Sequence, residues 1–70
     1  MLHLYEIQEL NKNLETKIIR QFTADPKTAK QEFKKYTEEN PGIYSLYQIH
    51  RVAAHFTVKE KNWQALSFLI

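Results

Sequence analysis

The sequence predicts a small α+β domain, in which one helix packs on one face of a four-stranded antiparallel sheet in the order ββαββ. One segment carries strong helix start and stop signals, and it has β-prone segments with alternating apolar and polar residues on both sides. A helix placed between two pairs of strands covers only one face of their sheet. The chain has 70 residues, so we expect a single domain, residues 1–70.

The segment before the helix predicts a β-hairpin. Residues 2–9 alternate between apolar and polar side chains, and residues 11–13 form a turn because asparagine tolerates a positive φ. Residues 15–23 are the second strand, which should pair with the first in antiparallel fashion. Strand alternation predicts Ile18 and Phe22 on one face and Ile19 on the other.

The helix is predicted over residues 25–39. Asp25 is suited to the N-cap position, and Pro26 to the first helical position, where no amide donor is needed. Pro41 ends the helix because it disfavours helical geometry at the residue before it. An apolar stripe at positions i, i+4 and i+7 is predicted to face the sheet: Ala29, Phe33 and Tyr36.

The segment after the helix predicts the other strands. We expect a strand over residues 43–51, a bend near residues 53–54, a continuation through residue 58, a polar turn at 59–62 and a last strand over 63–70. Tyr44 and Tyr47 are three residues apart, so they should occupy opposite faces. One of them is expected under the helix and the other on the uncovered face of the sheet.

Composition excludes several classes of chemistry. The chain has no cysteine, which excludes thiol catalysis and cysteine zinc sites, and its single glycine excludes a glycine-rich phosphate loop. The three histidines (His3, His50 and His55) have no acid at metal-site spacing, and the adjacent Glu38 and Glu39 diverge on a helix. We therefore predict that the protein is not an enzyme, with no catalytic residue, no metal and no organic cofactor.

The expected location of the protein follows from two kinds of segment that the sequence lacks. No apolar run reaches the roughly 20 residues of a membrane span. The first ten residues also lack the basic start of a signal peptide. We expect a cytoplasmic protein that does not bind membranes.

Basic residues suggest a binding surface. The formal net charge is +2, and Lys27, Lys30 and Lys34 are spaced to share one stripe of the helix. The candidate set is completed by Lys35, Arg20 and Arg51, provided that the strands present the two arginines beside it. Such a stripe contacts phosphates or an acidic protein groove, or it is simply solvated, so the candidate partners are single-stranded nucleic acid or a host protein.

Aromatic residues suggest a second surface. One helix leaves the other sheet face uncovered, although apolar residues occur on both faces of several strands. We predict a homodimer formed through this face or through a sheet edge, with Tyr5, Phe56 and Trp63 as candidate contacts. Stacking of single-stranded bases on the sheet is the alternative use of this face.

Residues 22–49 carry a family resemblance. The pattern has a Phe-x-Ala before an acidic helix start, small and aromatic helix residues, and a Pro before Tyr-Ser-Leu-Tyr and an aliphatic residue. The matching residues are Phe22, Ala24, Asp25, Ala29, Phe33, Pro41, Tyr44, Ser45, Leu46, Tyr47 and Ile49. The pattern resembles the small nonstructural proteins, sometimes labelled DNA-binding, of gokushovirus-type microviruses, which are tailless single-stranded DNA phages.

The resemblance covers roughly 30 of the 70 residues and has two departures. The family's strand usually leads into a glycine and a Phe-Asp pair, whereas this chain has His50-Arg51-Val52, and the helix spacing is also shorter by one residue. The resemblance implies a phage or mobile-element accessory protein that acts in the host cytoplasm by binding a macromolecule. Two alternatives remain: a small phage inhibitor that occludes a host defence protein, and a structural or assembly subunit.

Overall fold

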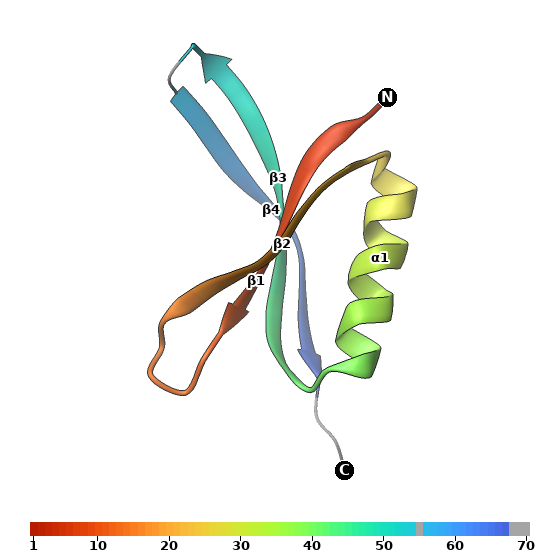
Figure 1. Ribbon diagram of the computed structural model, residues 1–70, viewed down its shortest axis with the longest axis vertical. Coiled ribbons are helices and arrows are strands. Elements are labelled where there is room, and N and C mark those ends of the chain that lie inside the picture. Colours follow the sequence, from red (N-terminus) through yellow and green to blue (C-terminus); the bar gives the residue numbers. More distant parts are fainter. Residues whose placement is uncertain (55, 68–70) are drawn as a thin grey trace.

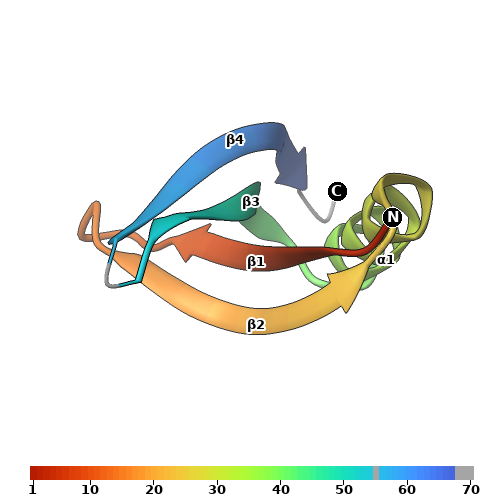
Figure 2. The same cartoon turned by 90° about the horizontal axis from the view of Figure 1, so that it is seen from above.

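One helix lies against one face of a four-stranded antiparallel sheet, which confirms the predicted α+β class (Figure 1). The structure is a computed structural model that describes residues 1–54 and 56–67. The elements are β1 (His3–Leu10), β2 (Thr16–Ala24), α1 (Pro26–Glu39), β3 (Gly42–Ala53) and β4 (Phe56–Ser67). The strand order is β2-β1-β3-β4, so β2 and β4 form the two edges (Figure 2). No helix among the described residues is long and apolar enough to cross a membrane.

Helix α1 begins and ends where the sequence predicts. The Asp25 carboxylate accepts a hydrogen bond of 2.7 Å from the backbone N–H of Thr28, and this contact lowers the pKa of Asp25. At the other end, Asn40 donates to the Tyr36 carbonyl from its backbone N–H at 3.1 Å and from its side-chain amide at 3.0 Å. Both ends thus have polar groups that satisfy otherwise unpaired backbone atoms.

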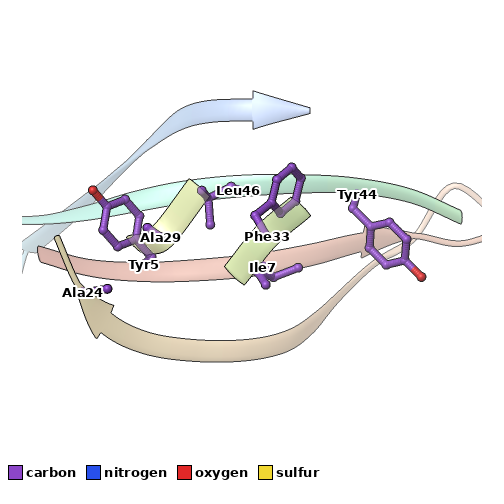
Figure 3. Close-up of a cluster of buried hydrophobic side chains, with 7 residues drawn as sticks. All are labelled: Tyr5, Ile7, Ala24, Ala29, Phe33, Tyr44 and Leu46. Atoms are coloured by element: carbon purple, nitrogen blue, oxygen red, sulfur yellow. The ribbon is translucent and has the colours of Figure 1, made fainter. Parts of the chain in front are cut away.

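The core lies between α1 and the middle of the sheet. The helix contributes Ala29 and Phe33, and Tyr36 packs against the cluster edge-on to Tyr44, with 5.3 Å between ring centroids. The buried apolar side chains are Tyr5, Ile7, Ala24, Ala29, Phe33, Tyr44 and Leu46 (Figure 3). The predicted helix stripe is confirmed, and Tyr44 is the tyrosine under the helix.

A bulge in β2 changes the predicted face of two residues. Arg20 and Ile18 each have a pairing partner in β1, whereas Ile19 between them has none. A bulge residue interrupts strand alternation. Ile19 therefore packs against the core together with Phe22, and Ile18 is exposed. The prediction that Ile18 and Phe22 share a face is wrong for this reason.

After the β3 strand begins, the described part of the chain reverses direction between Ala53 and Phe56, at the position of the predicted bend. The predicted polar turn at residues 59–62 is wrong, because these residues lie inside β4 and residues 59–61 pair with β3. Strand β4 is a sheet edge, so its charged side chains reach water without leaving the strand. For the same reason, residues 63–67 of the predicted last strand are the second half of β4, and residues 68–70 of that prediction lie outside the described residues.

Strands β3 and β4 extend beyond the rest of the sheet. The β1–β3 ladder ends at the pair Leu4–Ile49, whereas β3 and β4 continue to pair as far as Ala53 and Phe56. Residues 50–53 and 56–58 form a two-stranded projection, here named the arm, that points away from α1 (Figure 1). A hairpin without a further strand or helix is marginally stable in water, so the arm depends on the sheet at its base.

Candidate nucleic-acid interface

A groove of about 180 Å³ runs between α1 and the edge strand β4. Its lining residues are Lys30, Phe33, Lys34, Thr37, Trp63, Gln64 and Ala65. The floor consists of the Phe33 ring and Ala65, so the groove is apolar at its base. Two lysines from the helix and one tryptophan from the strand form its rim.

The rim places a positive charge over an aromatic ring. Trp63 pairs with the core residue Leu46 in β3, which directs its ring to the helix side of the sheet. The Lys30 Nζ lies 5.1 Å from the centroid of that ring, and 36% of Trp63 stays exposed. Lys34 follows Lys30 by one helical turn. Within the described part of the chain, neither lysine forms an ion pair, so both charges are available to an anion.

Three other predicted basic residues, Arg20, Lys35 and Lys27, do not line this groove. Arg20 and Lys35 line a separate cavity of about 220 Å³ on the β2 side, together with two carboxylates. The Arg20 guanidinium binds Glu32 at 3.2 Å, which partly neutralises that side. Lys27 is exposed in the first turn of α1, on the stripe of Lys30, without lining the groove.

The remaining predicted contact residues lie elsewhere. Arg51 is exposed in the arm, where it pairs with Thr57, and the predicted basic set is therefore split into three groups. Phe56 is 59% exposed at the tip of the arm. Tyr5 has no exposed surface, because it packs under the helix with its ring 5.9 Å from that of Phe22. The prediction of Tyr5 as a surface contact is thus wrong.

The uncovered face of the sheet holds a buried carboxylate that the sequence did not reveal. Glu6 has no exposed surface, and it accepts hydrogen bonds from Gln8, from Gln21 at 2.7 Å and from the Lys59 ammonium at 2.7 Å. Burial raises the pKa of Glu6, but the three hydrogen bonds and the charge of Lys59 outweigh it, and the pKa lies below its ordinary value of 4.5. Glu6 therefore stays ionised and ties β4 to β1 across β3.

The groove offers an aromatic ring and two lysine ammonium groups to a ligand. Among the described residues, no group of three or more His, Cys, Asp or Glu side chains could hold a metal ion. His50 and Glu60 form an exposed pair at 3.1 Å. Burial and the neighbouring Glu9 raise the pKa of Tyr44 to about 12, so its hydroxyl remains protonated. Stacking, cation–π contact and charge pairing with phosphate are what the groove supplies.

Comparisons with models of protein families, with curated proteins and with solved structures found no match.

Proposed function

We propose that the protein is a non-enzymatic accessory protein that binds single-stranded nucleic acid through the groove between α1 and β4. The observation that carries this proposal is the Lys30 ammonium over the partly exposed Trp63 ring, beside Lys34, which forms no ion pair among the described residues. Single-strand binding proteins combine positive charge along the backbone with aromatic rings on which bases stack. An unpaired base can enter a concave groove edge-on, whereas the bases of a duplex are stacked inside it.

The proposed biological setting is a phage or mobile element acting in the host cytoplasm. The resemblance of residues 22–49 to nonstructural proteins of single-stranded DNA phages supports this setting. A host protein with an acidic surface is the competing partner. An acidic protein surface offers negative charge to the lysines but no row of planar groups that stack on Trp63. Nucleic acid offers both, phosphates for the lysines and bases for the tryptophan ring.

Binding is expected to be visible in the intrinsic fluorescence of the protein. Trp63 is the only tryptophan, so any change in tryptophan emission reports directly on the groove. A short oligothymidylate at low salt should quench this emission, because a base stacks on the ring. Contacts from Lys27, Lys30 and Lys34 should give a slope of about −2 in a plot of log K against log salt, since each neutralised phosphate contributes about −0.7.

Lysine variants locate the contact on the helix. Lys30→Ala and Lys34→Ala should each reduce the magnitude of the slope by about 0.7. Lys35→Ala is the matched control, because it removes the same charge from the same helix on the side that faces β2. The proposal fails if oligonucleotides leave the emission unchanged at low salt, or if Lys35→Ala has the same effect as Lys30→Ala.

We also propose that the protein forms a homodimer through its arm. Val52, Phe56 and Val58 expose apolar surface there, and β4 presents an unpaired edge along the arm. Sedimentation equilibrium at micromolar concentration should therefore give a mass above the 8.4 kDa of one chain.

Phe56→Ser should lower the association constant of this dimer at least tenfold. Leu14→Ser is the control, because it removes an apolar side chain that is even more exposed than Phe56 but lies in the β1–β2 turn. A mass of one chain at all concentrations would exclude this dimer.

A further inference from the structure

A second bulge, at Asn62, places the residues on either side of it, Lys61 and Trp63, on opposite faces of the sheet. Trp63 pairs with Leu46 and Lys61 pairs with Tyr47, while Asn62 between them has no partner in β3. Leu46 and Tyr47 are consecutive in β3, so their side chains and those of their partners point to opposite faces. In a regular strand, residues two apart would share a face. The bulge thus directs Trp63 to the helix side and Lys61 to the uncovered side.

The uncovered side carries its own pair of an aromatic ring and a cation. The Lys61 Nζ lies 5.8 Å from the centroid of the half-buried Tyr47 ring. Arg51 is exposed further along the same face of β3, two strand positions beyond Ile49. Within residues 1–54 and 56–67, neither Lys61 nor Arg51 forms an ion pair. This face is therefore positively charged, apart from the carboxylate that is already bound to Lys59.

The two aromatic–lysine pairs flank the same open edge of the sheet. Among the described strands, β4 has β3 as its single neighbour, so its other side is an open edge (Figure 2). The two pairs are adjacent rungs of the β3–β4 ladder, separated only by the bulge. The uncharged Asn62, whose amide donates to Gln48 at 3.4 Å, lies between them at the edge. The carboxylate of β4 nearest to Asn62 in sequence is Glu60, which is paired with His50 at 3.1 Å.

We propose that one strand of nucleic acid wraps around the β4 edge, with one base on Trp63 in the groove and another on Tyr47 on the uncovered face. This inference rests on the proposed function and adds the path of the strand to it. Bases and phosphates alternate along a polynucleotide, which matches two rings that each lie beside a lysine. The path across the edge is short, on the order of the 10 Å that a sheet layer occupies.

Comparing the binding of a short and a long oligonucleotide distinguishes the contact at Trp63 from the contact at Tyr47. An oligothymidylate of about three nucleotides fills the groove alone, whereas one of about twelve also reaches the uncovered face. Tyr47→Leu and Lys61→Ala should each weaken binding of the long oligonucleotide about tenfold and leave binding of the short one unchanged. Lys30→Ala should weaken binding of both. All titrations follow the emission of Trp63, which none of these substitutions removes.

Lys17→Ala is the matched control, because it removes an exposed strand lysine from the opposite edge strand β2. Circular dichroism and urea unfolding establish that each variant is folded. The wrapped path is wrong if Tyr47→Leu and Lys61→Ala bind the long oligonucleotide as tightly as the unaltered protein does. Binding would then be confined to the groove. If neither length quenches Trp63 in the unaltered protein, the groove and the wrapped path are both refuted.

Discussion

Replacing Phe33 with alanine is expected to lower the free energy of unfolding by about 3–5 kcal/mol, the range for removing a buried phenylalanine side chain. Phe33 is 4% exposed and fills the space between α1 and the strands β1 and β3 (Figure 3). Native domains are stable by about 0.05–0.15 kcal/mol per residue, so a chain of this size has roughly 4–10 kcal/mol in total. The variant should therefore be partly or fully unfolded at 37 °C.

Urea unfolding followed by circular dichroism measures this loss. Lys34→Ala is the control, because it truncates the exposed neighbouring residue of the same helix and should change stability by less than 0.5 kcal/mol. A loss below about 1 kcal/mol for Phe33→Ala would show that α1 does not cover the sheet as described. Phe33 also forms the base of the groove, so any folded Phe33→Ala protein should bind oligonucleotides less tightly.

Replacing Glu6 with glutamine is expected to lower the free energy of unfolding by about 1–3 kcal/mol at pH 7. The glutamine has nearly the same shape, but its amide group opposes donors that now bind a carboxylate, namely Gln8, Gln21 and Lys59. Lys59 keeps 40% of its side chain exposed, and water can take over part of its hydrogen bonding. This exposure keeps the expected loss within that range.

The hydrogen bonds of the Glu6 carboxylate also predict that the stability of the protein depends on pH in acid. The pKa of Glu6 is lower in the folded protein than its ordinary value of 4.5, so the folded state favours the ionised form. The resulting stabilisation is complete above pH 4.5 and is lost as the pH falls through the pKa of the folded state. The difference in unfolding free energy between the unaltered protein and Glu6→Gln should thus shrink below pH 4.5.

Urea unfolding at pH 7, 5, 4 and 3 tests this dependence. Glu60→Gln is the matched control, because Glu60 is an exposed carboxylate whose partner His50 lies at the surface. Its effect should stay within 0.5 kcal/mol at each pH. A constant difference between Glu6→Gln and the unaltered protein over this range would mean that the Glu6 charge has no role in stability.

Local sequence signals determined the fold class and the helix. Asp25 and Pro26 act within the first turn of α1, and Pro41 acts on the residue before it, so these signals need no tertiary contact. The spacing of Ala29, Phe33 and Tyr36 likewise identified the buried face of the helix. The resemblance of residues 22–49 to phage proteins, and any function drawn from it, stays a prediction.

The candidate site depended on contacts between distant segments. Lys27, Lys30 and Lys34 share a stripe by sequence alone, but nothing in the sequence shows that Trp63 stands opposite Lys30. Their contact requires β4 to lie at the sheet edge beside α1, which the strand order decides. The same order puts Arg20 on the other flank of the helix, where a carboxylate binds it.

The sequence by itself determined the helix, most of the extended segments and the apolar residues that the helix buries, because caps, proline and periodicity act over a few residues. Only the tertiary structure decided the faces of the strands after each bulge, at Ile19 and at Asn62. It also decided that residues 59–62 belong to a strand. A bulge is defined by the register of the partner strand, and a charged segment remains extended when an edge position leaves its side chains in water. Both depend on residues far away in the sequence, so no local pattern predicts them.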